Sequence, residues 1–323
     1  MKTIQISRHG GPEVLEVTEA PTPVPAQGEV LVRHTAVGLN FIDTYQRSGL
    51  YPLKLPSGLG MEAAGVVEAL GAGVDRFAVG DRVAYCGPPP GAYAESRAIA
   101  ADRLVRIPPR IEERTAAAAM LKGLTAWYLL RRSYPARPGD TVLSYAAAGG
   151  VGLILSQWAA SLGVRVIGVA GTAEKAALAK ANGCAEVVLT DDPAFVARVR
   201  ELSGGQGVAA VYDSVGRDTF SRSLDCLRRH GVMVTYGNAS GAVEPFSPLE
   251  LSKRGSLYVT RPTLWDFIAT RSDLETATAE LFGVIASGAV QIRIGQTYAL
   301  TAVAQAHRDL EGRRTTGSTV LLP

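Results

Sequence analysis

The fold is decided by the stretch TVLSYAAAGGVG at residues 141–152, which an apolar run from Val151 to Leu162 continues. A strand, a glycine turn and a helix are predicted in that order. Small residues at such a turn allow a pyrophosphate to approach the backbone, and free N–H groups at the start of the helix stabilise its charge. Gly149, Gly150 and Gly152 meet this demand, so we expect a dinucleotide-binding loop here, with cofactor contacts at Gly149, Gly150 and Val151. Because Ala147 replaces the first glycine of G-x-G-x-x-G, an ordinary tight turn is the alternative interpretation.

Strands and helices alternate on the C-terminal side of this loop. The predicted strands are 165–170, 186–189, 208–212, 232–236 and 257–260, and the predicted helices between them are 173–182, 195–202 and 220–227. Strands that alternate with helices in this way form a parallel sheet with helices on both faces. The fold class is therefore α/β, with a Rossmann doubly wound parallel sheet domain at residues 123–264.

The chain before residue 123 has a different pattern of residue types. Short β-rich runs such as 29–33 and 65–68 are separated by clusters of glycine and proline, which is typical of an all-β, barrel-like unit. The C-terminal stretch, with a helix near 274–287 and strands near 297 and 318–322, does not continue the strand and helix alternation. We assign residues 1–122 and 265–323 together to a β-barrel domain, into which the nucleotide-binding domain is inserted.

Composition argues against several classes of protein. The chain has 323 residues, of which 47% are apolar and 20% charged, as expected for a globular protein with a large core. The net charge is only +3 and no basic run is present, so we expect no nucleic-acid partner. No apolar stretch is long enough for a membrane span and the start lacks a signal-peptide region, so a cytoplasmic location is expected.

Cysteine and histidine patterns point away from disulfide, metal and hydrolase chemistry. Cys86, Cys184 and Cys226 are too scattered for a disulfide framework or a CxxC metal pair, so each is expected to be a buried, small apolar residue. The four histidines are dispersed, and no G-x-S-x-G nucleophile elbow is present. Hydrolase activity is therefore not expected.

The end of the second predicted strand selects the cofactor. An Asp or Glu there would pair with the ribose 2′-hydroxyl of NAD, but this strand ends in Ala170, Gly171 and Thr172. An uncharged turn followed by Lys175 suits a 2′-phosphate, because no carboxylate at the turn repels it. The expected cofactor is NADPH, although Glu174 could partly offset the charge of Lys175.

Ordered motifs along the chain carry a family resemblance. They are GLNFIDTY at 38–45 with Gly49, Tyr51, Pro52 and Pro56 after it, GMEAAGVV at 60–67, GDRV at 80–83, KGLT at 122–125, AGGVG at 148–152, YDSVG at 212–216 and YVTRP at 258–262. In this order they resemble the zinc-free quinone oxidoreductases, the zeta-crystallin-like family of the medium-chain dehydrogenase/reductase superfamily. The resemblance covers essentially the whole chain.

The resemblance implies a GroES-like β-barrel domain joined to the Rossmann domain, with the active cleft between them and a small-molecule quinone as substrate. It also implies a homodimer formed through edge strands near 257–260. Zinc-dependent relatives place a cysteine at the position of Asn40 and a histidine at that of Met61, and neither substitute is a good zinc ligand. We therefore expect no metal, and we expect Glu62 to be a hydrogen-bonded structural group. A quinone suits a site without zinc because its ring is already electrophilic.

The site residues implied by the resemblance fall into two sets. The catalytic set comprises Asn40, Asp43, Tyr45 and Tyr51. The cofactor-binding set comprises Phe41, Ile42, Thr44, Thr125, Tyr128, Gly149, Gly150, Val151, Gly171, Thr172, Lys175, Thr190, Ser214, Gly237, Asn238, Val259, Arg261 and Arg313. The two catalytic tyrosines could stack on a flat ring and donate a hydrogen bond, and half-buried packing is the alternative interpretation. Thr190 stands where relatives that prefer NADPH often carry a tyrosine, so it can donate a hydrogen bond there but cannot stack.

Two other functions remain open at the level of sequence. The first is a zinc-free reductase of the same fold that acts on an enal, an enone or an enoyl thioester, with Tyr45 or Tyr51 as the hydrogen-bond donor to the enolate. The second is a non-enzymatic protein that binds NADPH and RNA. The lack of a basic stripe interleaved with aromatic residues argues against the second.

Overall fold

The computed structural model describes all residues from 1 to 323, which form two compact units. The first unit comprises Met1–Lys122, Thr270–Ala286 and Ile292–Pro323, and the second comprises Gly123–Ala269 and Ser287–Gln291. Residues 265–269 and 287–291 thus group with the second unit, whereas the sequence pattern placed both segments in the first. For residues 265–269 the reason is a local contact, because the ring of Phe267 stacks on that of Tyr128 with centroids 4.9 Å apart.

A six-stranded parallel sheet forms the centre of the second unit, in the order β11-β10-β9-β12-β13-β14. The strands are β9 (Thr141–Ser144), β10 (Arg165–Ala170), β11 (Cys184–Leu189), β12 (Val208–Asp213), β13 (Leu227–Thr235) and β14 (Tyr258–Thr260). From β9 the chain extends the sheet first on one side and then on the other, which is the doubly wound arrangement. The predicted Rossmann domain is confirmed.

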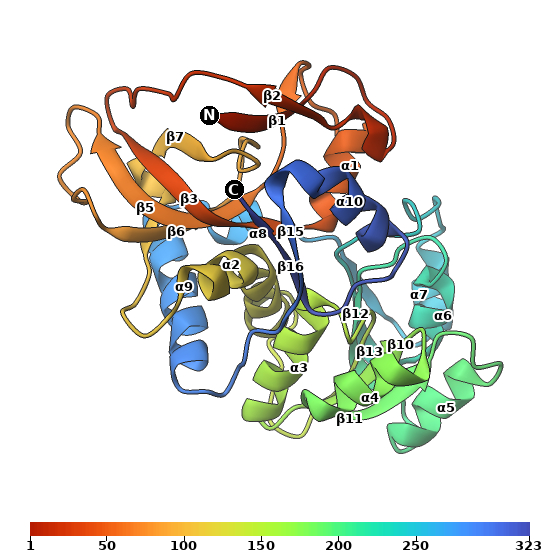
Figure 1. Ribbon diagram of the computed structural model, residues 1–323. Helices are drawn as coiled ribbons and strands as arrows, with labels where there is room; N and C mark the ends of the chain where they lie inside the picture. The colour runs from red at the N-terminus through yellow and green to blue at the C-terminus, as the bar shows by residue number, and fades with distance from the viewer. The chain divides into compact units, whose positions relative to one another are not determined.

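Helices cover both faces of this sheet. They are α3 (Gly150–Ser161), α4 (Ala173–Ala181), α5 (Phe195–Leu202), α6 (Phe220–Asp225), α7 (Leu249–Lys253) and α8 (Leu264–Phe267). Figure 1 shows α3 and α4 side by side, and both pack against β10. Strand β12 is buried along its whole length, as a parallel strand with two covered faces must be.

Antiparallel sheets dominate the first unit. A three-stranded sheet joins β2 (Glu16–Glu19), β1 (Lys2–Ile6) and β4 (Ser57–Gly58). A seven-stranded sheet has the order β15-β16-β3-β5-β6-β8, with β7 also paired to β3. Its strands are β3 (Glu29–Leu39), β5 (Glu62–Leu70), β6 (Arg82–Cys86), β7 (Ser96–Ala100), β8 (Val105–Arg106), β15 (Ile294–Ala299) and β16 (Ser318–Leu322).

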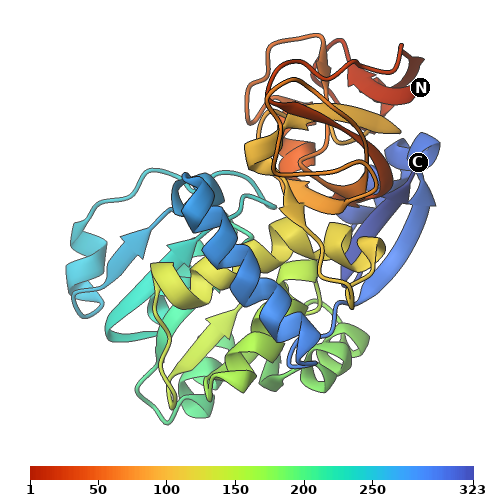
Figure 2. The ribbon, with the colours of Figure 1, turned by 90° about the vertical axis from the view of Figure 1, so that its left-hand side faces the viewer.

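The C-terminal segment completes this larger sheet. Strand β16 pairs antiparallel with β3, with Thr319 opposite Leu39 and Val320 opposite Gly38. Figure 2 shows the C-terminal strands, in dark blue, next to strands from the N-terminal part of the same unit. The chain therefore leaves the first unit near residue 122 and returns to it after forming the second.

Helices of the first unit are α1 (Phe41–Ser48), α9 (Arg271–Ala286) and α10 (Val303–Glu311), and α2 (Glu113–Tyr128) runs across the division between the units. Shorter helical turns are η1 (Pro12–Val14), η2 (Ala101–Arg103), η3 (Leu129–Ser133) and η4 (Leu300–Ala302). Helices α1 and α10 lie outside the elements predicted from the sequence, because both are short and their apolar positions are few. None of the helices combines the length and the apolar character that crossing a membrane requires.

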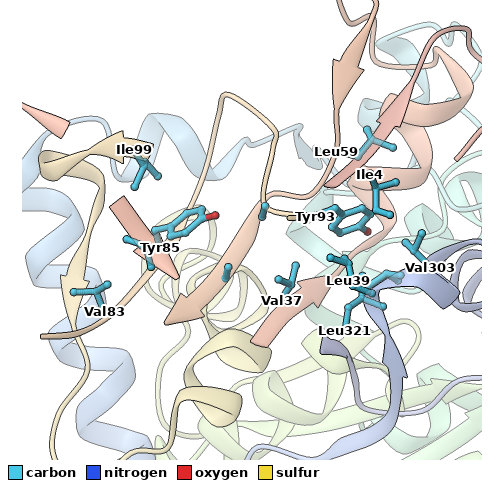
Figure 3. Packing of buried hydrophobic residues seen from close by; sticks show 14 of the residues in the cluster. Ile4, Val37, Leu39, Leu59, Val83, Tyr85, Tyr93, Ile99, Val303 and Leu321 are labelled. Atoms are coloured by element: carbon cyan, nitrogen blue, oxygen red, sulfur yellow. The ribbon is translucent and has the colours of Figure 1, made fainter. Parts of the chain in front are cut away.

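Side chains from the N-terminal third and from the C-terminal end of the chain share one core in the first unit. Figure 3 shows Ile4 and Leu59 beside Tyr93, and Leu321 beside Leu39, all of them buried. All three cysteines are buried as well, which confirms the prediction that they are core residues. Because this core takes residues from both chain ends, truncation at either end would expose it.

We expect Leu321→Ala to lower the free energy of unfolding by about 2–5 kcal/mol, because it leaves a cavity at a position with 0% exposure. Chemical denaturation followed by fluorescence measures this. Leu249→Ala is the matched control, since Leu249 is 65% exposed and its truncation should cost no more than about 0.5 kcal/mol. Equal losses in the two variants would show that the C-terminal strand does not support the core.

Candidate active site

Helix α1 and the residues next to it carry the four candidate catalytic residues. The backbone N–H of Asn40 donates to Asp43 Oδ2 over 2.8 Å, so this carboxyl group caps the start of the helix. The helix ends at Gly49, whose φ of 85° is left-handed and favours glycine. The chain then folds back, and the N–H of Tyr51 donates to the carbonyl of Tyr45 over 3.0 Å.

The two candidate tyrosines form one aromatic group. Their rings meet edge to face with centroids 5.3 Å apart, and the ring of Phe41 lies 6.3 Å from that of Tyr45. Tyr45 is buried, whereas Tyr51 is half-buried. Packing thus accounts for much of the surface of Tyr45, and Tyr51 keeps an accessible face for a flat ligand.

Glu62, at the start of β5, gathers three hydrogen-bond donors in a fully buried position. Its Oε1 accepts from Asn40 Nδ2 over 2.8 Å and from Lys122 Nζ over 2.7 Å. Its Oε2 accepts from the backbone N–H of Leu121 over 2.6 Å. The side chain of Glu62 is 0% exposed and that of Lys122 is 8% exposed. The prediction that Glu62 is a hydrogen-bonded group is confirmed, and its partner Lys122 belongs to α2.

Gly38 makes room for this carboxyl group. A Cβ atom at residue 38 would lie 2.1 Å from Glu62 Oε1, which is far inside van der Waals contact. Strand β3 can therefore pass Glu62 only with glycine at this position, and Gly38 pairs directly with Glu62 in the sheet.

A second buried chain of hydrogen bonds orders Asp43. The Tyr93 hydroxyl donates to Asp43 Oδ2 over 2.7 Å and lies 3.1 Å from His307 Nε2. Arg47 Nη1 lies 2.9 Å from His307 Nδ1. Because a guanidinium can only donate, Nδ1 is the acceptor, Nε2 carries the imidazole proton, and that proton points at the Tyr93 oxygen. Arg47 is held in turn by an ion pair with Glu311, 2.7 Å away.

Burial decides which side chains of this hydrogen-bonded network carry a proton. Burial raises the pKa of Asp43 to about 7, although the hydrogen bonds from Tyr93 and Asn40 act in the opposite direction. Burial, with the adjacent Arg47 charge, lowers the pKa of His307 to about 3, so its ring is neutral. Asp43 Oδ2 already accepts two hydrogen bonds, whereas the buried Oδ1 has no partner. A proton on Asp43 therefore belongs on Oδ1.

The glycine turn between β9 and α3 has the shape that a pyrophosphate requires. A Cβ atom at residue 152 would lie 2.4 Å from the carbonyl oxygen of Ala146, so only glycine allows the helix to begin this close to the strand. The first turn of α3 contains Gly150 and Val151, and N–H groups in a first turn have no acceptor within their own helix. The residues present fit the diphosphate of a dinucleotide.

Other predicted cofactor contacts lie at the carboxyl ends of neighbouring parallel strands. Thr172 follows β10 and caps α4, because its Oγ1 accepts from the N–H of Lys175 over 3.3 Å. Thr190 follows β11, and its hydroxyl donates to the Ala170 carbonyl over 3.2 Å. Since ligands of such sheets bind at this edge, the strand ends together form one candidate nucleotide surface.

The loops after β12 and β13 contact each other at the same edge. A Cβ atom at residue 237 would lie 2.3 Å from the carbonyl oxygen of Ser214, so Gly237 is required for this approach. Asn238 follows directly and is half-buried. Ser214 and Gly237, two of the expected cofactor contacts, thus lie next to each other.

The remaining predicted contacts are distributed between the two units. In the second unit Thr125 and Tyr128 are buried on α2, Gly171 and Arg261 are exposed after β10 and β14, and Val259 is half-buried on β14. In the first unit Phe41 and Ile42 are half-buried and Thr44 is buried on α1, while Arg313 is exposed after α10 with a φ of 57°. Arg313 is thus well separated in sequence from the other contacts and sits in a loop of its own.

A catalytic zinc ion does not fit this donor set. No group of three or more His, Cys, Asp or Glu side chains is arranged to hold a metal ion. The nitrogen groups on Glu62 are an amide and an ammonium, and an ammonium is a hydrogen-bond donor without a lone pair for a metal.

Several residues of these networks were not among the predicted site residues. They are Arg47, Tyr93, Lys122 and His307, and all are buried. Lys122 lies in one of the sequence motifs, and a lysine beside apolar helix residues is the signal that could have singled it out. Arg47, Tyr93 and His307 carry no local signal, because they meet only through the fold.

Comparison with known proteins places these features in a family. The family model described as "Alcohol dehydrogenase GroES-like domain" matches residues 26–109, and that described as "Zinc-binding dehydrogenase" matches residues 150–281. A quinone oxidoreductase of Pseudomonas aeruginosa is 52% identical over 100% of this chain and 99% of its own length. A 2-haloacrylate reductase of Burkholderia is 43% identical over 98% of each chain.

A solved structure agrees with the whole fold. The Escherichia coli quinone oxidoreductase complexed with NADPH superimposes with a TM-score of 0.98 at 49% identity, covering 100% of both chains. The barrel and Rossmann parts of the fold class are therefore both confirmed.

Asp43→Asn should become more stable relative to the parent protein as the pH rises. Between the ordinary pKa of 3.8 and the folded-state value of about 7, the folded parent holds a proton on Asp43 that the unfolded chain has lost. The parent therefore loses stability over this range, whereas the neutral amide does not titrate. Denaturant unfolding at about pH 5 and about pH 8 measures the free energy of unfolding of both proteins. The value for Asp43→Asn minus that for the parent should increase by on the order of 2–3 kcal/mol over this range.

The buried histidines titrate in both proteins, so their contributions cancel in this difference. A difference that stays constant with pH would show that the Asp43 pKa is not raised.

Proposed function

Because the chain belongs to the quinone oxidoreductase family of the medium-chain dehydrogenase/reductase superfamily, we propose that it reduces a quinone to the hydroquinone with NADPH and without a metal ion. In the net reaction a quinone, NADPH and one proton give the hydroquinone and NADP⁺. The observation that carries the proposal is the buried cluster around Asn40 and Asp43, which can hold a proton but offers no metal site.

The second unit would bind the cofactor at the carboxyl edge of its sheet. The first turn of α3 would hold the diphosphate, and the turn after β10 would hold the 2′-phosphate, because it contains Thr172 and Lys175 and the strand itself ends without a carboxylate. Glu174 hydrogen-bonds to Thr172 in the same turn and would have to be offset by Lys175. When bound there, NADPH supplies the hydride.

The first unit would supply the proton and position the acceptor. Asp43 would hold a proton on Oδ1, since its Oδ2 is already engaged, and would give it to the reduced ring. Tyr51, and the exposed part of Tyr45, would hold the flat ring, while Asn40 is held in place by Glu62. Tyr93, His307 and Arg47 would position Asp43 without touching the substrate.

Reduction of an activated alkene is the second candidate function. It is favoured by the 43% identity to a 2-haloacrylate reductase, and the same cluster could protonate the enolate that forms when a hydride adds to a β carbon. A non-enzymatic role in RNA binding has no supporting observation in the structure.

We also propose a cytoplasmic location and a homodimer. Strand β14 is at the edge of the six-stranded sheet, and its Tyr258 is 62% exposed. An edge strand with an exposed aromatic side chain is suited to pairing with the same strand of a second copy.

Oxidation of NADPH, followed by the loss of nicotinamide absorbance, should be rapid with 1,4-benzoquinone and slow with a simple enone. NADH should give a lower kcat/KM than NADPH. Turnover of the enone but not of the quinone would show that the enzyme is an alkene reductase. Tight binding of RNA that NADPH displaces, with no turnover of either acceptor, would refute an enzymatic role.

Lys175→Met should raise the KM for NADPH about tenfold and leave that for NADH unchanged, because a charge-assisted hydrogen bond to the 2′-phosphate is lost. Lys180→Met is the matched control on the same helix, where the side chain is 52% exposed and paired with Glu186. A parallel loss of affinity for both cofactors in Lys175→Met would assign Lys175 a structural role.

A further inference from the structure

Lys122 has hydrogen-bonding capacity that the protein does not use. An ammonium group carries three N–H donors, and Glu62 Oε1 is the one protein acceptor that Nζ contacts. The side chain is 8% exposed, so bulk water reaches it poorly. A buried charge with unused donors is costly unless a further acceptor arrives. The acceptor that would complete this group is an oxygen atom of a ligand.

Glu62 positions this ammonium beside a predicted catalytic residue. Lys122 Nζ and Asn40 Nδ2 both donate to the same oxygen, Glu62 Oε1. The other oxygen is occupied by the Leu121 N–H. The carboxylate thus accepts three hydrogen bonds, two of them at Oε1, and the two side-chain nitrogen groups are held next to each other. Asp43 lies close enough for its carboxyl group to sense the charges of both Glu62 and Lys122.

We propose that Lys122 is a catalytic residue whose ammonium donates a hydrogen bond to the ring oxygen of the quinone that becomes negatively charged on reduction. The proposal rests on the quinone reductase function. Hydride addition, with its two electrons, converts the quinone to the hydroquinone monoanion, and Lys122 stabilises that anion while remaining protonated. Asp43 then gives its proton to the anion, and solvent returns a proton to Asp43. The charge balance is complete without another reactant.

An ammonium group in this position would stabilise negative charge on a substrate oxygen, as a metal ion does in other enzymes. A metal ion stabilises negative charge on a substrate oxygen as a Lewis acid, and a buried cation that donates a hydrogen bond has the same electrostatic effect in a site of low dielectric constant. Lys122 shares the carboxylate of Glu62 with Asn40, so the cation is held beside a predicted catalytic residue.

The test compares two variants that differ only at Lys122. Glu62→Gln removes the buried negative charge and keeps a carbonyl oxygen that can accept from Asn40. Glu62→Gln/Lys122→Met removes both charges together, so neither variant holds an unpaired buried carboxylate. The control is Lys180→Met/Glu186→Gln, which removes an exposed ion pair with a 3.0 Å separation and should leave kcat unchanged.

The first readout is kcat with 1,4-benzoquinone, its 2-methyl derivative and its 2,6-dimethyl derivative. We expect the double variant to be about a hundredfold slower than Glu62→Gln with benzoquinone, as for the loss of one oxyanion donor. The loss should grow with each methyl group, because the hydroquinone anion becomes more basic and depends more on the cation. A structural role of Lys122 would lower kcat equally for all three, and that result would overturn the proposal.

The second readout needs no turnover. 4-Nitrophenol, bound to the enzyme with NADP⁺, should ionise more readily in the parent protein than in the double variant, and the phenolate absorbance reports this. We expect binding of the phenolate to weaken about tenfold in the double variant. Equal binding of the phenolate by the double variant and by Glu62→Gln would overturn the role of Lys122.

The two readouts separate the two proposals. Quinone turnover by the parent protein, with no difference between Glu62→Gln and Glu62→Gln/Lys122→Met in either assay, would leave the proposed function in place and refute the role of Lys122. Failure of the parent protein to reduce any quinone, with phenolate binding that depends on Lys122, would refute the proposed function and leave Lys122 as an anion-binding cation.

Discussion

The fully buried carboxylate of Glu62 is the constraint on which the site depends. A charge without water must be paired and hydrogen-bonded, or the fold would lose several kcal/mol. Here three donors come from two places in the chain: the side chain of Asn40 at the start of α1, and the Leu121 N–H and the Lys122 side chain on α2. Glycine at position 38 is required because any larger residue would collide with the carboxyl group. Strands β3 and β5 and helices α1 and α2 are thus held in one arrangement by a single side chain.

The buried Glu62 carboxylate also fixes the start of α1, where the predicted catalytic residues Asn40 and Asp43 lie. Once Asn40 is held by Glu62, its backbone N–H engages Asp43, and the first turn of the helix is ordered. The other side of Asp43 is ordered by Tyr93 and, through His307 and Arg47, by helix α10. The acid near the N-terminus therefore depends on a segment that is far away in the sequence. A hydrogen-bonded network thus runs from Asp43 through Tyr93, His307 and Arg47 to the ion pair with Glu311.

The same architecture is compatible with quinones and with activated alkenes, since both acceptors take a hydride and then a proton. In a quinone the negative charge appears on a ring oxygen, whereas in an activated alkene it appears on an enolate. The two acceptors therefore require hydrogen-bond donors at different places. In the proposed mechanism, the cation of Lys122, the neutral acid Asp43 and the two tyrosines would serve either kind of acceptor. The selectivity among acceptors would then depend on shape around Tyr51 and on how far the charge of Lys122 reaches, rather than on a different catalytic group.

The sequence by itself determined the parallel sheet, the glycine turn after β9, the lack of a carboxylate after β10 and the location of Asn40, Asp43 and the two tyrosines in one motif. All of these are local, because periodicity, turn residues and short motifs are read within a few residues of one another. Helices α1 and α10 were missed because they span only 8 and 9 residues and contain few apolar positions. The tertiary structure alone decided that Lys122 pairs with Glu62, 60 residues away, and that Arg47 meets His307, 260 residues away. Such contacts depend on how strands pair and how the C-terminal segment returns, and no local pattern encodes the partner of a buried charge.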